Sequence, residues 1–275
     1  MVLENQPHSD DAPIGTIYSR REALALAAKA GIGLTAGGLF TFASAQDTKP
    51  KVNLIASPAL TEGPFFVDEK LKRSNLLLGT TRPAVINGTP LELELAIHKL
   101  TGDKHVPFTG CQIDIWHCDA AGVYSDESNP MNHEDTAKQT WLRGYQVTDK
   151  NGIAKFQTIV PGWYPGRTAH IHFKVRTFSE KHQVTADFTS QLFFHETDLK
   201  HIFGKAPYST QDVPAGLNMR DGIYAERQVD GSVAGSHLTL DLKSASKGNS
   251  AKFAIVLTDR NFKAGGGPEG GWEQF

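Results

Sequence analysis

Cysteine is scarce in this chain of 275 residues, which contains only Cys111 and Cys118. The two lie seven apart in a predicted strand and its exit, so their side chains point to opposite faces and the strand rise holds them beyond disulfide reach. CxxC pairs and Cys/His clusters are also absent, which disfavours a structural zinc site. We therefore expect both thiols to be small buried groups.

An excess of basic residues is also missing. The chain carries 28 Lys and Arg against 30 Asp and Glu, with a formal net charge of -2. Phosphate backbones and anionic lipid surfaces attract strongly basic proteins, so nucleic acid is not an expected partner. The 39% hydrophobic and 21% charged residues are ordinary for a globular protein with a core of its own.

Long apolar runs are absent apart from one weak stretch near the N-terminus. Residues 1–22 are polar and end in Arg20 and Arg21, and residues 23–45 are rich in Ala and Gly and close with Ala-Ser-Ala. This order predicts an export signal over residues 1–45, cleaved after Ala45. The stretch is too rich in Gly and Ala, and too interrupted by charge, for a membrane span.

The paired arginines of this segment resemble a twin-arginine signal, which carries proteins across a membrane already folded. The mature protein is then expected to be periplasmic or extracellular and free of the membrane. Ala23 stands where that signal favours Phe, and Lys29 interrupts the apolar run. An amphipathic helix of a cytosolic protein therefore stays an alternative.

The remaining sequence has the period of strands. Polar residues 46–60 are expected to form an extended linker. Apolar and polar residues alternate in six later segments: 91–95, 111–117, 169–175, 191–194, 238–242 and 253–257. Turn signals such as Asn87-Gly88 separate them. The pattern predicts an all-β fold over residues 61–262, an antiparallel β-sandwich with long functional loops, followed by a Gly-rich tail at 263–275.

His170 and His172 form the sharpest local feature of this β-rich region. They lie two apart on a predicted strand, so both imidazoles project from one face, about 6–7 Å apart at their roots, where one metal ion can bridge them. The spacing by itself is a weak signal, because zinc sites use it and many such pairs bind nothing.

Two tyrosines near this pair suggest which metal it would hold. Tyr164 precedes it in a turn bounded by Pro and Gly, and Tyr124 follows a predicted core strand. Phenol has a free pKa near ~10, but a hard, highly charged cation favours the phenolate, and iron(III) fits better than zinc or iron(II). A two-His-one-carboxylate iron(II) site would need an Asp or Glu, and residues 152–178 contain none. Most tyrosines are packing residues, so local chemistry does not select these two from the six.

Longer motifs carry a resemblance. They are Thr-Glu-Gly-Pro-Phe-Phe at 61–66, Ile-Trp-His-Cys-Asp-Ala-Ala-Gly-Val-Tyr-Ser at 115–125, Leu-Arg-Gly-Tyr-Gln-Val-Thr-Asp at 142–149, the stretch from Phe-Gln-Thr-Ile to His-Ile-His-Phe at 156–173, and Ser-Gln-Leu-Phe-Phe at 190–194. In this order they resemble the intradiol ring-cleavage dioxygenases, the family of protocatechuate 3,4-dioxygenase and catechol 1,2-dioxygenase.

The resemblance implies a β-sandwich with one non-haem iron(III) per chain, held by Tyr124, Tyr164, His170 and His172. It further implies that Arg167 lies beside the substrate, and that Gln191 matches a glutamine lying behind the ligands and serving catalysis. The reaction implied is cleavage of a catechol-type ring between its two hydroxyl-bearing carbons with O2, giving a cis,cis-muconate-type diacid. Tyr164 would also accept a substrate proton, and Arg167 would stabilise developing negative charge.

Some features stay open at this level. Phe65 and Trp163 are candidates to flank the substrate ring, although both also suit a core. Too few residues separate Ala45 from Thr61 to hold the helical segment of the catechol-specific branch, and the Tyr164–His170 loop is shorter than in the protocatechuate enzymes. The sequence therefore does not select the substrate, and it does not give the oligomeric state. Alternatives are an exported β-sandwich that binds phenolic ligands without catalysis, and a zinc hydrolase using the His pair.

Overall fold

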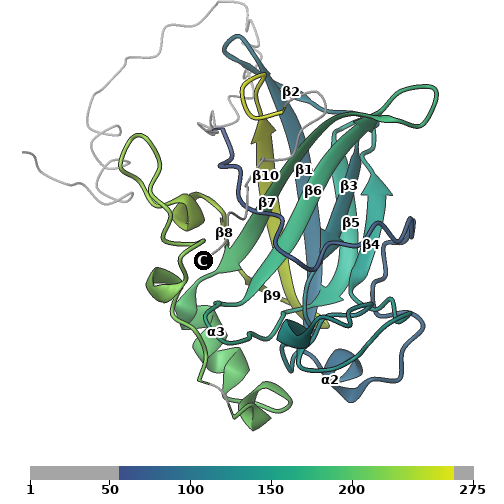
Figure 1. Ribbon diagram of the computed structural model, residues 1–275. Helices are drawn as coiled ribbons and strands as arrows, with labels where there is room; N and C mark the ends of the chain where they lie inside the picture. Colours follow the sequence, from purple (N-terminus) through teal and green to yellow (C-terminus); the bar gives the residue numbers. More distant parts are fainter. Residues whose placement is uncertain (1–55, 213, 263–275) are drawn as a thin grey trace, which may run out of the picture. The chain divides into compact units, whose positions relative to one another are not determined.

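The computed structural model describes residues 56–212 and 214–262, which fold around two packed β-sheets (Figure 1). The expected export signal and the Gly-rich tail lie outside the described residues. In the expected linker, only residues 56–60 are described, and they lie against the sandwich. The backbone N–H of Ser57 donates to Val256 O, and Leu60 is buried.

The first sheet has the strand order β2-β1-β10-β9, and β5 pairs with β1 as well. Its strands are β1 (Pro90–Thr101), β2 (Lys104–Pro107), β5 (Ile153–Ile159), β9 (Lys243–Ala245) and β10 (Gly248–Leu257). The second sheet has the order β4-β3-β6-β7-β8. Its strands are β3 (Gln112–Trp116), β4 (Arg143–Val147), β6 (His170–Phe178), β7 (Val184–Phe194) and β8 (Thr239–Leu240).

The all-β sandwich expected from the sequence is confirmed, with one departure in strand direction. Most neighbouring strands are antiparallel, but β1 pairs with β10 in parallel and β7 pairs with β8 in parallel. Parallel neighbours need a long crossover connection rather than a tight hairpin. Most of the remaining fold connects β1 to β10, and a shorter part of it connects β7 to β8. The alternation of residues within a strand cannot reveal such connections.

The core lies between the two sheets and is filled from the alternating positions of each strand. Leu91, Leu93, Leu95 and Ile97 of β1 meet apolar side chains of the second sheet, among them Ile113, Ile115, Ile171, Phe173 and Val175. All of these are at most 1% exposed. Cys111 and Cys118 are also buried, and both are free thiols, as the sequence predicted.

The outer face of the second sheet is covered too, by residues 57–73, which we call the strap. Figure 1 shows this purple segment crossing the second sheet, and ion pairs fix it there. Lys174 and Arg176 of β6 pair with Glu62 and Asp68 of the strap. Consequently His170 to Arg176 are all buried, on both faces of the strand.

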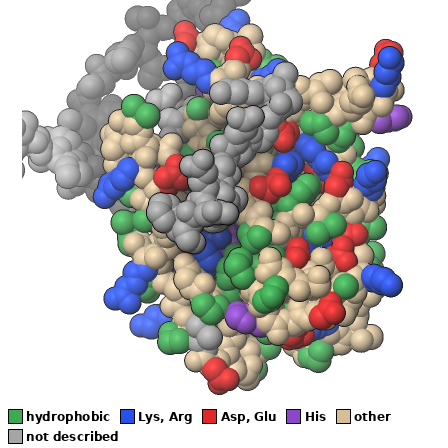
Figure 2. All heavy atoms as spheres, viewed as in Figure 1, with side chains coloured by type: hydrophobic (Ala, Val, Ile, Leu, Met, Phe, Trp, Pro, Cys, Tyr) green, Lys and Arg blue, Asp and Glu red, His purple; other side chains and the backbone are tan. Residues whose placement is uncertain are grey.

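Helices are short and lie in the connections. They are α2 (Pro83–Ile86) and α3 (Glu196–Phe203), with single 3-10 turns elsewhere. No helix among the described residues is both long enough and apolar enough to span a membrane. On the face in Figure 2, acidic and basic side chains are interspersed rather than gathered by sign.

Candidate metal centre

His170 and His172 begin β6 and point to its outer face, under the strap. In the register, His172 lies beside Trp116 of β3 on one side and Gln191 of β7 on the other. The Trp116 and His172 rings are stacked, with centroids 4.9 Å apart and planes within 9°. This packing holds the His172 imidazole parallel to the Trp116 ring, and both histidines are only 1% exposed.

The four expected ligands come together. His170 Nε2 is 3.0 Å from His172 Nε2, 3.2 Å from Tyr124 Oη and 3.4 Å from Tyr164 Oη. These donor atoms come from three segments of the chain, and the Tyr124 and Tyr164 hydroxyls reach the same nitrogen from different loops. The two phenols and two imidazoles thus form one compact cluster.

Tyr124 is held by the loop that follows β3. The Asp119 carboxylate accepts the backbone N–H groups of Ala121 and Val123, closing a tight turn. The amide of Tyr124 donates to the Asn132 side chain, and its carbonyl accepts from that same side chain. The Tyr124 backbone is therefore fixed on both sides by local hydrogen bonds, and its ring is fully buried.

Arg143 fixes the same loop from the neighbouring strand β4. Its guanidinium donates to the Ser125 carbonyl at 2.6 Å and to the Phe65 carbonyl at 2.6 Å. The Phe65 ring in turn stacks on Tyr124 with centroids 4.4 Å apart. One buried cation therefore joins the strap to the Tyr124 loop.

Tyr164 is placed by a second loop that packs directly on the first. Gly122 has a left-handed φ of +85°, and a Cβ added there would lie 2.1 Å from the Trp163 carbonyl oxygen. A Cβ added at Gly162 would likewise lie 2.5 Å from the Ala120 carbonyl oxygen. Only residues without side chains allow the two ligand-bearing loops to approach this closely.

Burial sets the protonation of the cluster. It raises the pKa of Tyr124 and of Tyr164 above the ordinary phenol value, so both are neutral without a cation. Burial, with the nearby Arg167 charge, lowers the pKa of His170 and of His172 well below the usual imidazole range. Two neutral imidazoles are ready ligands, and two phenols need a strong cation to lose their protons.

Arg167 lies at the edge of the cluster. Its Nη1 is 3.3 Å from Tyr164 Oη, its Nη2 donates to Gln191 Oε1 at 2.5 Å, and its Nε donates to Asp221 at 2.9 Å. Gln191 is fully buried, and its amide donates to the Thr61 carbonyl in the strap. Burial acts to lower the pKa of Arg167, but the Tyr164 oxygen and the Asp221 carboxylate more than offset this, so its pKa is raised.

Phe65 and Trp163, the candidates for flanking the substrate ring, are 1% and 5% exposed. Phe65 contacts both tyrosines, stacking on Tyr124 and meeting Tyr164 edge to face at 5.9 Å. Trp163 packs on Phe203 of α3, with centroids 4.4 Å apart. Phe65 therefore shields the cluster, while Trp163 contacts the helix behind the Tyr164 loop.

The donor set fits a single small metal ion. With bonds of about 2.0–2.1 Å, neighbouring donors around one ion stand roughly 2.9–3.4 Å apart, which matches the separations above. Within the described ranges, no group of three or more His, Cys, Asp or Glu side chains could hold a metal. The two phenol oxygens would complete the donor set of such an ion, and hard oxygen donors with imidazole suit a ferric ion better than zinc.

Three residues of the site were not singled out from the sequence. Trp116 reads as a core residue, and Asp221 lies far along the chain in an irregular segment that gives no signal of its role. Arg143 stands within one of the quoted motifs and begins the strand β4. An unpaired arginine buried there would be costly, which is the signal that could have found it.

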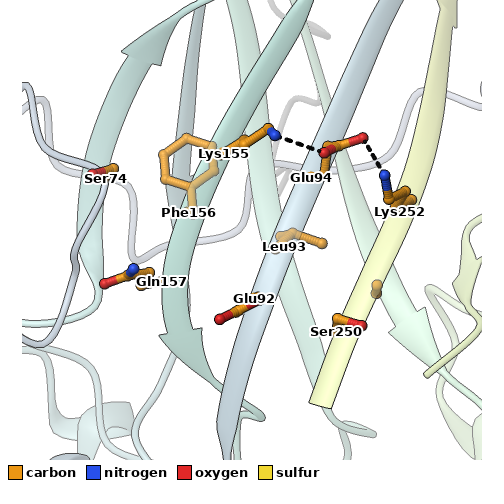
Figure 3. Close-up of a pocket in the computed structure, with 10 residues that line it drawn as sticks. Ser74, Glu92, Leu93, Glu94, Lys155, Phe156, Gln157, Ser250 and Lys252 are labelled. Atoms are coloured by element: carbon orange, nitrogen blue, oxygen red, sulfur yellow. Dashed lines mark ion pairs between the residues drawn. The ribbon is translucent and has the colours of Figure 1, made fainter. Parts of the chain in front are cut away.

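Two hollows lie away from the cluster. One, of about 310 Å³, lies on the outer face of the first sheet, and Figure 3 shows Glu94 there between Lys155 and Lys252. Both lysines pair with Glu94, at 3.1 and 3.0 Å. The other, of about 460 Å³, is lined by α3 and residues 215–217. None of the four clustered side chains lines either hollow.

A protein-family model described as a dioxygenase matches residues 61–220, more than half of the chain. The chain belongs to the intradiol ring-cleavage dioxygenase family. An intradiol ring-cleavage dioxygenase from Tetranychus urticae has a similar structure, with a TM-score of 0.61 and 27% identity over 74% of this chain and 94% of that one.

Curated relatives support the same family. Catechol 1,2-dioxygenase of Candida albicans is 25% identical over 157 residues, which cover 50% of this chain and 48% of the relative. Chlorocatechol 1,2-dioxygenase of Pseudomonas putida is 27% identical over 150 residues, covering 48% and 51%. This intradiol dioxygenase homologue spans about half the length of the curated relatives it matches.

Proposed function

We propose that the protein is a non-haem iron(III) dioxygenase that opens the ring of a catechol-type substrate with O2 between the two hydroxyl-bearing carbons. The product is a cis,cis-muconate-type diacid. The observation that carries the proposal is the meeting of Tyr124, Tyr164, His170 and His172 around one point, in a chain that belongs to the intradiol family.

The proposed ligands are these four side chains, with one iron per chain. When bound, iron(III) supplies a Lewis-acidic centre that takes up the deprotonated catechol and makes its ring reactive toward O2. Tyr124 is fully buried and hydrogen-bonded through its backbone, so it suits a permanent ligand. Tyr164 lies at the edge of the cluster, beside Arg167.

The residues of the chain would handle protons and charge. Tyr164 Oη, as a phenolate, accepts a proton from one substrate hydroxyl. The Arg167 guanidinium, 3.3 Å from that oxygen, then stabilises negative charge that develops on the substrate, in a site where buried charges act strongly. Gln191 holds one edge of the guanidinium, and Phe65 and Trp116 exclude water from the donors.

Oxygen uptake against a panel of catechol, hydroxyquinol and protocatechuate tests the proposal, with products identified by mass spectrometry after reaction with labelled O2. Both oxygen atoms should appear in a diacid. A protein that binds catechols without consuming oxygen would instead be a phenol-binding module. If metal analysis finds one zinc per chain and the protein shows hydrolase activity, the zinc hydrolase alternative is favoured.

We also propose that the protein is exported by the twin-arginine route. The support is the sequence of residues 1–45, which lie outside the described residues. The donor atoms of the site come from segments that meet only in the folded chain, so metal binding and folding are coupled. An export route that carries proteins already folded suits such a site.

A further inference from the structure

The Arg167 guanidinium uses each of its three nitrogens on a different partner. Nη1 faces Tyr164 Oη, Nη2 donates to Gln191, and Nε donates to Asp221 Oδ2 at 2.9 Å. An arginine side chain has several rotatable bonds, so fixing it in one orientation costs conformational entropy. Contacts on Nε and Nη2 settle its orientation, and Nη1 is thereby aimed at the tyrosine.

Asp221 is itself held rigidly. Its side chain is 1% exposed, and Oδ2 accepts the backbone N–H of Thr168 at 2.9 Å as well as Arg167 Nε. Oδ1 accepts the amides of Ile223 at 2.8 Å and Tyr224 at 3.2 Å. A buried carboxylate with four donors has a fixed position, so it can determine where its partner lies.

The segment around Asp221 is built against the Arg167 turn. A Cβ added at Gly216 would lie 2.5 Å from the Arg167 carbonyl oxygen, so backbone contacts backbone there. The Asn218 side chain accepts from the Thr168 hydroxyl at 2.8 Å. Asn218 thus braces the turn without contacting the guanidinium, while Asp221 contacts both.

We propose that Asp221 is a positioning residue that holds the Arg167 guanidinium toward Tyr164 and balances its charge. The inference rests on the proposed function, since it gives Arg167 its task. Asp221 acts through Arg167 and does not contact the clustered donors. It lies 54 residues along the chain from Arg167, and one residue beyond the stretch that matches the family model.

Charge balance has a consequence for the substrate. The Arg167 cation is already paired, as are the nearby Lys174 with Glu62 and Asp187. A ring carboxylate would find no unpaired cation among these groups, whereas a catechol without an ionised ring substituent needs none. The proposed substrate class is therefore catechols that carry no carboxylate.

The experiment compares Asp221→Asn with wild type in the iron-loaded full-length protein. Catechol and protocatechuate are titrated in the absence of oxygen, following the visible band, and turnover is measured separately. We expect kcat/KM for catechol to fall by about tenfold or more, as part of the loss from Arg167→Ala. Relative affinity for protocatechuate over catechol should rise roughly fourfold, because the variant leaves the Arg167 charge without its carboxylate partner.

A double-mutant cycle separates positioning from a general structural role. If Asp221 acts through Arg167, adding Asp221→Asn to Arg167→Ala should change kcat/KM by no more than about twofold. Asn218→Ala should lower thermal stability of the metal-free protein without shifting the protocatechuate preference. Asp230→Asn is the matched control, because the exposed Asp230 carboxylate accepts the Ser232 amide in a similar turn, and we expect no change.

The proposal is wrong if Asp221→Asn leaves the preference between protocatechuate and catechol unchanged, and if it lowers kcat/KM by the same factor with Arg167 present and with Arg167→Ala. If Asp221→Asn does not fold, Asp221→Ser takes its place, since a hydroxyl can still accept from the Ile223 or Thr168 amide. Wild type that consumes no oxygen with any catechol would contradict the proposed function. The anaerobic titrations would still decide the role of Asp221.

Discussion

His170 Nε2 and His172 Nε2 lie 3.0 Å apart, beneath a strap that no local pattern in β6 indicates. Two neutral ring nitrogens this close either share a proton or bind the same cation. Two phenol oxygens lie within 3.4 Å of His170 Nε2. This donor set is the basis for the iron(III) site proposed above, and the visible absorption of the protein tests it.

Iron-loaded protein is expected to be red to burgundy, because phenolate-to-iron(III) charge transfer absorbs visible light. Tyr164→Phe should shift this band and slow turnover, since one charge donor and one proton acceptor are lost. Visible absorption and metal content check both points. Tyr145→Phe is a suitable control, because Tyr145 lies on β4 outside the cluster. A colourless protein that is fully loaded with zinc would contradict the iron assignment.

Arg167→Ala and His170→Ala should differ in kind. Arg167→Ala is expected to keep the iron and most of the colour while turnover falls by roughly 10²–10³, the usual loss for one charge-stabilising group. His170→Ala should lose the metal, because it removes a donor at the centre of the cluster. Iron content per chain and kcat measure the difference. Equal behaviour of the two variants would show that their roles are not divided as proposed.

Gly122→Ala should destabilise the protein and weaken iron binding, because the added Cβ would meet the Trp163 carbonyl at 2.1 Å. The two ligand-bearing loops would have to separate, at a cost of about 1–3 kcal/mol. Gly79→Ala is the matched control, since Gly79 has a similar φ of +80° but nothing within 4 Å of an added Cβ. The difference between the two variants in the free energy of unfolding, measured with denaturant, gives the cost of the steric contact alone. Equal losses of stability in both variants would contradict the close contact.

Stability should fall in acid partly through His117. Burial lowers the pKa of His117 to about 4, against about 6.5 in the unfolded chain. Between these values the unfolded state binds a proton that the native state does not, so the contribution is complete above about pH 6.5 and is lost as pH falls toward 4. The loss is about 3 kcal/mol.

The check is urea unfolding of metal-free wild type and His117→Gln between pH 7 and pH 4. His117 Nδ1 donates to Cys118 O and Nε2 accepts from the Thr158 hydroxyl, an arrangement of the neutral ring. The variant should therefore be less stable at neutral pH and show a shallower fall in acid. Parallel pH profiles would mean that His117 titrates normally in the folded protein.

Replacing Arg20 and Arg21 together by lysine keeps the charge but should block export. The reason is that a folded-protein route reads the arginine pair itself. Folded, coloured and active enzyme should then accumulate inside the cell, as cell fractionation and activity assays would detect. Unchanged export of the double variant, or a mature N-terminus upstream of Arg20, would show that the segment has another role.

Much of the sandwich follows from sequence alone, because strand alternation is local. Leu91, Leu93 and Leu95 alternate with glutamates, so their shared face had to be buried, and the chain places them in the core. His170 and His172 had to share a face for the same reason. What alternation could not give was pairing direction, and β1 and β10 are parallel neighbours more than 150 residues apart.

The candidate site divides in the same way. Residues 164–172 placed Tyr164, Arg167 and the two histidines within one short segment, and the family resemblance added Tyr124 and Gln191. Tertiary structure alone brought in Arg143, Trp116 and Asp221, which reach the cluster from other strands and loops. Their contacts depend on register and on which loops pack together, and these are set by the whole fold, since no local periodicity records the distance between residues far apart in the chain.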